Sequence, residues 1–132
     1  MTEHLDLDDL LAAAEAALGR PPDVRDAGIL DAATARTRAS VYGEDAYRSL
    51  VEKAGALLQS IVTGDPLVDG NKRLGWVAVR LFCRMNGHDL AAPVDAVFEL
   101  VRAVADGTLR DVPEIAARLR PWITKAGATE DP

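Results

Sequence analysis

Apolar residues recur at intervals of three and four along most of the chain, in stretches that glycine and proline separate. The first stretch places its apolar residues on one face of a helix: Leu7, Leu10, Leu11, Ala14 and Leu18. Gly19 and Pro21 then end the pattern. Aromatic residues make up 5% of the chain and runs of β-branched residues are short, so strands are disfavoured. The sequence therefore predicts an all-α fold.

Six helices are predicted, and a chain of 132 residues is expected to fold them into one domain. Their approximate ranges are 7–18, 28–39, 46–63, 71–86, 93–106 and 111–123, with Asp111 and Glu114 as a capping pair for the last. The fourth is apolar on nearly every side, which is typical of a buried central helix. The domain is predicted to span residues 1–123, and residues 124–132 are predicted to be disordered.

Charge and cysteine content narrow the classes of function. Fifteen basic and 21 acidic residues give a net charge of −6, which argues against direct nucleic-acid or anionic-membrane binding. The single cysteine, Cys83, cannot form an internal disulfide, and the acidic start differs from the basic start of a signal peptide. No stretch reaches the roughly 20 apolar residues that span a bilayer. These features predict a cytoplasmic protein.

The stretch GDPLVDGNKR, residues 64–73, interrupts the helical pattern and places two cations where a helix begins. It is not a phosphate-binding P-loop, because Asn71 separates Gly70 from Lys72 and no strand precedes it. A calcium loop that starts at Asp65 needs glutamate at its twelfth position, where Trp76 stands. Scattered single histidines and one cysteine do not form a zinc site.

Two interpretations of this helix start remain open. The first turn of a helix exposes unpaired N–H groups, so Lys72 and Arg73 are unfavourable there by roughly 0.3–1 kcal/mol each unless an anion is bound. In the first interpretation, the flexible Gly70 and the two cations form a phosphate cradle, and Asp69 holds Mg²⁺ against the phosphate. In the second, Asp69 or Asn71 is an ordinary N-cap and both cations are solvated.

The stretch resembles the active-site motif of the Fic/Doc superfamily, His-Pro-Phe-x-Asp/Glu-Gly-Asn-x-Arg. The matching residues are Pro66, Leu67 (for phenylalanine), Asp69, Gly70, Asn71 and Arg73. The resemblance covers about residues 5–123 and is closest to the small Doc branch, the death-on-curing toxins. Lys72 and Trp76 favour that branch. Fic adenylyltransferases typically have glycine where this chain has Lys72, and arginine where it has Trp76. Residues 40–50 resemble the flap segment that precedes the motif.

The resemblance implies a single Fic-fold domain and the toxin of a toxin–antitoxin system, an ATP-dependent kinase that phosphorylates elongation factor Tu and stops translation. It implies ATP and Mg²⁺ as cofactors, with Asp69 on the metal. Gly70 and Asn71 would provide the anion-binding backbone and a positioning amide, and Lys72 and Arg73 would bind the phosphates. The implied partner is a Phd-like antitoxin whose C-terminal segment folds into a groove of the toxin.

One residue departs from the motif. Asp65 stands where the catalytic histidine is expected, and its ordinary pKa near 3.9 makes it a weaker base than histidine. The sequence therefore predicts an inactive or impaired enzyme. Two alternatives stay open: a Fic-type adenylyltransferase, and a non-catalytic binding module that keeps the fold.

Overall fold

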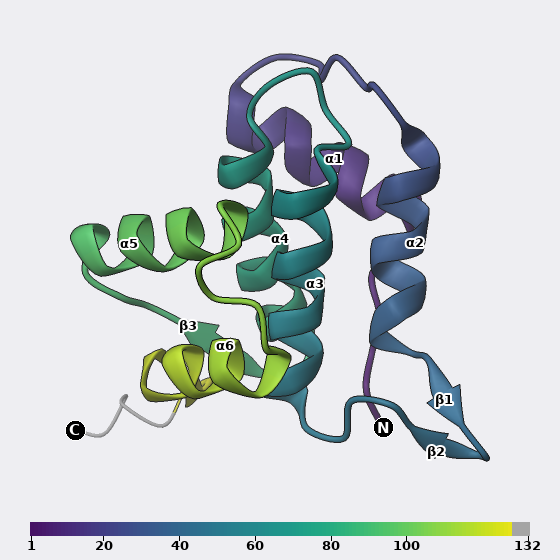
Figure 1. The fold of residues 1–132 in the computed structure, drawn as a ribbon, viewed down its shortest axis with the longest axis vertical. Coiled ribbons are helices and arrows are strands. Elements are labelled where there is room, and N and C mark those ends of the chain that lie inside the picture. The colour runs from purple at the N-terminus through teal and green to yellow at the C-terminus, as the bar shows by residue number, and fades with distance from the viewer. Residues whose placement is uncertain (128–132) are drawn as a thin grey trace.

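The computed structural model, described here for residues 1–127, contains six α-helices and short strands (Figure 1). The helices are α1 (Leu7–Leu18), α2 (Ala27–Thr37), α3 (Leu50–Gly64), α4 (Asn71–Met85), α5 (Val94–Ala105) and α6 (Val112–Leu119), and a 3₁₀ turn follows at Arg120–Trp122. The prediction of a small all-α domain is confirmed. Within the described range, no helix is long and apolar enough to cross a membrane.

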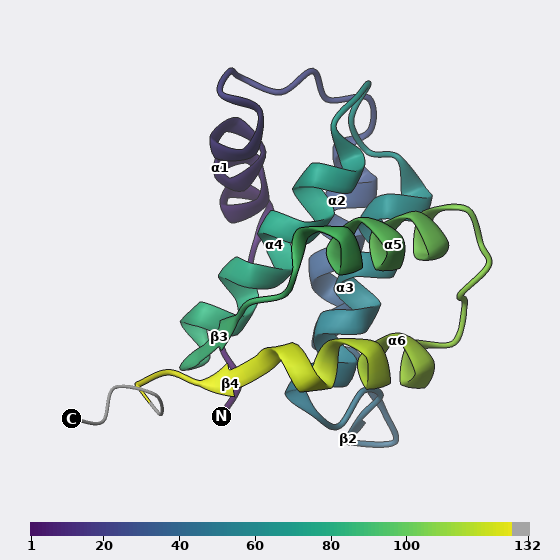
Figure 2. The ribbon, with the colours of Figure 1, turned by 90° about the vertical axis from the view of Figure 1, so that its left-hand side faces the viewer.

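The central helix is α3, not α4, so the prediction that residues 71–86 form the most buried helix is wrong. In Figures 1 and 2, α3 runs through the middle of the domain, and it packs against α2, α4, α5 and α6. Its small residues let these neighbours approach: a Cβ added to Gly55 would lie 3.3 Å from Cγ2 of Ile115. On α4, the side chains of Arg80 and Leu81 reach the surface, and Leu81 is 37% exposed.

Among residues 1–127, four short strands that the sequence pattern did not predict pair in two antiparallel two-stranded sheets. Strands β1 (Ser40–Val41) and β2 (Glu44–Asp45) form one, and β3 (His88–Leu90) and β4 (Ile123–Lys125) form the other. Helix α3 consequently starts at Leu50 rather than near 46, behind a capping box between Ser49 and Glu52. Two-residue and three-residue strands are too short for the alternating pattern that predicts a strand.

The last predicted helix ends earlier than expected. Helix α6 stops at Leu119, and the chain then returns in β4 alongside β3 (Figure 2). Thr124 and Lys125, in the segment predicted to be disordered, belong to β4. The rest of that prediction falls largely on residues 128–132, which lie outside the described range. Asp111 is the N-cap of α6 but makes no side-chain capping bond, so the predicted capping pair is absent.

The N-terminal segment is anchored to the domain through His4. Its Nδ1 lies 2.9 Å from Oγ1 of Thr37, and its ring centroid is 6.2 Å from that of Phe82. The neighbouring Leu5 is buried in the core. Burial lowers the pKa of His4, and the positive charges of Arg38 and Lys53 act in the same direction.

This environment predicts a pH-dependent contribution to stability. Because folding depresses the pKa of His4 below 6.5, the unfolded chain binds this proton more readily than the folded protein does. The free energy of unfolding of the native protein should therefore decrease as the pH falls through about 6.5 towards the folded pKa. His4→Gln should lose this component, measured by urea denaturation at a series of pH values. An identical pH dependence in both proteins would contradict the prediction.

Candidate functional site

The loop that joins α3 to α4 is held by buried and hydrogen-bonded residues at both ends. Helix α3 ends with Asp65 in the left-handed conformation, at φ 51° and ψ 57°. Leu67, two residues on, is 1% exposed and belongs to the core. The side chain of Arg25 donates from Nε to the carbonyl of Asp65 (2.8 Å) and from Nη2 to that of Gly64 (2.9 Å). A cation thus satisfies the exposed carbonyls at the end of α3.

The connection between α1 and α2 lies directly against this loop. The N–H groups of Arg25 and Asp26 donate to the carbonyl of Pro66 at 2.8 and 3.0 Å, and Val68 donates to Asp23 at 2.9 Å. Val24 and Leu67 form an antiparallel bridge. Figure 1 shows the two connections together at the top of the domain. Residues 23–26 therefore cover the loop as a flap does.

Residues 40–50, which resemble a flap in sequence, do not cover the loop. Their hairpin lies at the opposite end of α3 (Figure 1). Lys53, which is 2% exposed, fixes it there by donating from Nζ to Oδ2 of Asp45 (3.1 Å) and to the carbonyl of Tyr47. The assignment of residues 40–50 as the flap is corrected accordingly. The flap-like pairing of residues 23–26 with 66–68 was missed, because a single bridge has no sequence periodicity.

Asn71 closes the loop with its side chain. Its Oδ1 accepts a hydrogen bond from the N–H of Leu67 at 2.9 Å, and its Nδ2 donates to the carbonyl of Leu67 at 3.0 Å. Both ends of the amide are therefore used on the backbone. Asn71 therefore holds the shape of the loop in this structure.

The start of α4 has no side-chain cap. Its N-cap is Gly70, at φ 84°, and the first intrahelical bond runs from the N–H of Leu74 to the carbonyl of Gly70. Neither Asp69 nor Asn71 caps the helix, so the ordinary N-cap interpretation is wrong. A side chain at position 70 would be strained at this φ, and its Cβ would lie 2.5 Å from Cδ2 of Leu18. The first-turn N–H groups are left available for an anion.

A cavity of about 730 Å³ opens in front of this helix start. It brings together the predicted residues Asp65, Asp69, Gly70, Asn71, Lys72 and Arg73. Lys72 and Arg73 are exposed, and neither forms an ion pair among residues 1–127. Two unpaired cations therefore face the same cavity as the uncapped N–H groups. We call this arrangement the cradle, meaning residues 70–73.

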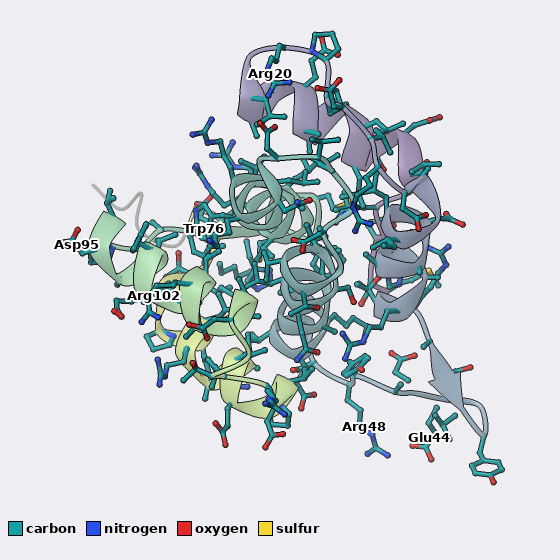
Figure 3. The ribbon with its side chains drawn as sticks, turned by 45° about the horizontal axis from the view of Figure 1, so that its top comes forward. Arg20, Glu44, Arg48, Trp76, Asp95 and Arg102 are labelled. Atoms are coloured by element: carbon teal, nitrogen blue, oxygen red, sulfur yellow. The ribbon has the colours of Figure 1, made fainter. Side chains whose placement is uncertain are left out.

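Two arginines of the cavity were not predicted, Arg20 from the connection that follows α1 and Arg102 from α5 (Figure 3). Arg20 donates from Nη2 to Oδ1 of Asp69 at 3.0 Å. Arg102 pairs with Glu99 and Asp106, both at 3.0 Å. Neither arginine belongs to a sequence motif. Only the packing of α1 and α5 around α4 brings them to the cavity, so no local signal identifies them.

Charges of both signs meet at the rim of the cavity. Hydrogen bonds from Thr108 hold the pKa of Asp106 below its ordinary value, and the charges of Arg102 and Lys72 also lower it. The hydrogen bond with Glu99 raises the pKa of Arg102. Both groups therefore remain charged at neutral pH. The cavity offers a polyanion the cations Lys72 and Arg73, which are free within residues 1–127, while the carboxylates of Asp69 and Asp106 are paired with Arg20 and Arg102.

A magnesium ion that accompanies bound phosphates fits these residues. Among residues 1–127 there is no cluster of three or more metal-binding side chains that could hold an ion without help. Mg²⁺ typically takes only one or two protein carboxylates together with substrate phosphates and water. Asp69 lies in the cavity and satisfies that requirement, although in this structure its carboxylate pairs with Arg20. Metal binding through Asp69 would require Arg20 to release this carboxylate.

The sequence of this chain is similar to known proteins in two comparisons. Residues 4–83 match the Fic/DOC family. The chain is also 50% identical to a protein named Toxin Doc from Mycolicibacterium smegmatis, over 128 residues that cover 96% of this chain and 98% of that protein. The chain belongs to the Fic/DOC family. The resemblance to the Fic/Doc superfamily, which was inferred from the motif, is thereby confirmed.

The region that matches the Fic/DOC family begins at His4 and ends at Cys83, so it includes the loop and nearly all of α4. Cys83 itself is a core residue, and burial raises the pKa of its thiol to about 11. A thiol in that state is a poor nucleophile at neutral pH. Cys83 is therefore a structural core residue and not a candidate nucleophile.

Proposed function

We propose that this protein is the toxin of a toxin–antitoxin pair, and that its cavity binds ATP for phosphoryl transfer to a protein of the translation machinery such as elongation factor Tu. The observation that supports it most is the uncapped start of α4, where Lys72 and Arg73 have no ion pair in the described structure. The identity with Toxin Doc over nearly the full length of both chains supports the toxin role.

In this proposal the phosphates of ATP lie against the first-turn N–H groups of α4, with Lys72 and Arg73 balancing their charge. Asp69 would hold Mg²⁺, which neutralises charge that develops on the transferred phosphoryl group. Asn71 would keep the loop in shape through its two bonds to Leu67. The hydroxyl of the target would approach residue 65, where a base removes its proton.

Asp65 occupies that base position in an exposed place, and we propose that it serves the reaction poorly. An exposed carboxylate is a weak base, and its negative charge lies in the same cavity as the phosphates. The protein would then bind Mg-ATP while its transfer activity stays low. A binding module without catalysis is the second candidate, favoured by this residue alone.

The cradle can be tested by Arg73→Ala. Removing a cation that faces the phosphates should weaken the binding of Mg-ATP by about tenfold or more, because a charge-assisted hydrogen bond to an ion contributes about 1.5–3 kcal/mol. Isothermal calorimetry measures the change. The matched control is Arg110→Ala, whose side chain is also exposed but bonds to Gly107 outside the cavity.

Equal weakening in both variants, or no binding of Mg-ATP by the native protein, would reject the cradle. Transfer is then followed with ATP labelled at the α- or the γ-phosphate. Label from the γ-phosphate on the target supports a kinase, and label from the α-phosphate shows an adenylyltransferase instead.

The proposed partner is a Phd-like antitoxin. Its gene should lie next to the gene of this protein, and the antitoxin should bind this protein directly.

A further inference from the structure

Arg25 holds the chain at the end of α3 from a position 40 residues earlier in the sequence. Its Nε donates to the carbonyl of Asp65, and its Nη2 donates to the carbonyl of Gly64 and contacts that of Asp65 as well. The planar fork of the guanidinium thus spans two consecutive carbonyls at the negative end of the helix dipole. Arg25 lines neither the cavity in front of α4 nor a second cavity between α4 and α5. Its contacts are therefore with the backbone of the loop and not with the space that a ligand would fill.

The bonds on either side of residue 65 fix the direction of its side chain. The N–H of Asp65 donates to the carbonyl of Ile61 at 3.3 Å, and the carbonyl of Asp65 accepts from Arg25 at 2.8 Å. A residue has only two soft backbone angles, so holding the peptide on each side also fixes the direction of the Cα–Cβ bond. Asp65 lines the cavity together with the cradle. Arg25 therefore sets where a side chain at position 65 lies relative to the cradle.

The conformation of residue 65 depends on contacts of this kind. Its φ of 51° and ψ of 57° are left-handed, a region that is unfavourable for residues with a Cβ even though aspartate tolerates it better than most. Such a conformation persists where the surrounding structure determines it. Residues 23–26 supply that structure, because they also bond to the carbonyl of Pro66 and to the N–H of Val68.

Two arginines of the connection between α1 and α2 act on different kinds of group. Arg20 pairs with the carboxylate of Asp69, which a metal ion would need. Within residues 1–127, the side-chain bonds of Arg25 all go to backbone carbonyls. An anionic ligand is not attracted to a carbonyl oxygen, so phosphates in the cradle would not compete for the partners of Arg25. Arg25 can therefore keep its bonds while the cavity is occupied.

We propose that Arg25 is a positioning residue for the side chain at position 65. It holds that side chain in the cavity beside the cradle, and it touches neither the phosphates nor the reacting hydroxyl. The importance of this position for proton transfer rests on the proposed function, whereas the geometry of residue 65 does not. A displacement of about 1 Å in a reacting group can cost roughly a hundredfold in rate, so an arginine outside the cavity can control the reaction.

Amide hydrogen exchange, compared between the native protein and Arg25→Ala, tests the geometry without ATP, target or activity. The amides of Asp65 and Val68 should exchange about tenfold faster or more in the variant, and the amide of Leu57 in the middle of α3 should change much less. Unchanged exchange at Asp65 and Val68 would overturn the proposal. Equal acceleration of all three amides would overturn it as well, because Arg25 would then affect only the stability of the whole domain.

The matched control is Arg110→Ala. Arg110 also donates from Nε to a backbone carbonyl just after a helix, that of Gly107 at 2.8 Å. It lines neither cavity. Its removal should leave the exchange of the Asp65 and Val68 amides unchanged.

A reporter at position 65 separates positioning from a merely structural role. In Asp65→His, inorganic tripolyphosphate bound in the cradle should raise the pKa of the introduced imidazole, followed by NMR, because nearby negative charge favours the imidazolium. Adding Arg25→Ala should reduce this increase by about half or more, because the interaction weakens with distance. The affinity for tripolyphosphate, measured by calorimetry, should stay within about twofold, since the cradle is intact. Arg25→Lys keeps the charge but not the planar fork, so it should recover part of the increase. An increase that Arg25→Ala leaves unchanged would overturn the proposal.

Failure of the proposed function gives a different pattern of results. If neither tripolyphosphate nor Mg-ATP binds, the cradle is rejected, and the exchange experiment alone decides the role of Arg25. If Asp65→His transfers phosphate, adding Arg25→Ala should lower kcat by about tenfold or more with little change in the KM for ATP. A loss confined to KM would overturn the proposal, because Arg25 would then act on binding and not on the position of the base.

Discussion

Replacing Asp65 with histidine is expected to produce ATP-dependent modification of a translation protein and growth arrest in cells that express the variant. A well-placed general base typically accelerates such a step by about 10²–10⁴-fold. Histidine has an ordinary pKa near neutrality, so much of it is free to accept a proton where an exposed aspartate is a weak base. The rate should therefore change far more than the affinity for Mg-ATP, which depends on the cradle.

The fold should tolerate this substitution. Position 65 has φ 51°, and among residues other than glycine the left-handed region is populated preferentially by asparagine, aspartate and histidine. The side chain of Asp65 is exposed, and the contacts that hold this position are made by its backbone with Arg25 and Ile61. The midpoint temperature of thermal unfolding of the variant should therefore lie close to that of the native protein.

The matched control is Asp31→His, an exposed aspartate on α2 outside both cavities. It should stay as inactive as the native protein in transfer assays and harmless in cells. Growth arrest by Asp65→His should be relieved when the antitoxin is co-expressed. A histidine variant that folds, binds Mg-ATP and still transfers nothing would reject the idea that the site lacks only a base. The non-catalytic alternative would then be preferred.

Leu57→Ala should be the most informative test of the fold. Leu57 is fully buried on α3, in the middle of the helices that surround it. Truncating a buried leucine to alanine costs roughly 2–5 kcal/mol, from lost burial and from the cavity that remains. The free energy of unfolding from urea denaturation should decrease by that amount. In a domain of ordinary stability, such a decrease is a large part of the total free energy of unfolding.

Leu81→Ala on α4 is the matched control. Leu81 is 37% exposed, so its truncation should cost much less than that of Leu57. A larger effect at Leu81 than at Leu57 would show that α4, not α3, is the centre of the domain. Equal effects at the two positions would also contradict the packing described above.

Helical content could be predicted from local pattern. Apolar residues at three- and four-residue spacing, with terminators such as Gly19, located all six helices, although some ends were shifted by several residues. The most buried helix could not be identified in this way. Periodicity shows which residues avoid water, but not how many neighbours a helix has. The small residues of α3, such as Gly55, permit contact on several sides, and only packing reveals it.

The sequence by itself determined which residues form the cradle, because Gly70, Asn71, Lys72 and Arg73 are consecutive and share one helix start. Residues that lie next to one another in the chain need no tertiary information to be placed together. Only the tertiary structure decided what surrounds them. Arg20 reaches the cavity from the connection after α1 and Arg102 from α5, and residues 23–26 cover the loop, because helices distant in sequence pack around α4. Side chains that converge from separate helices leave no common spacing in the sequence.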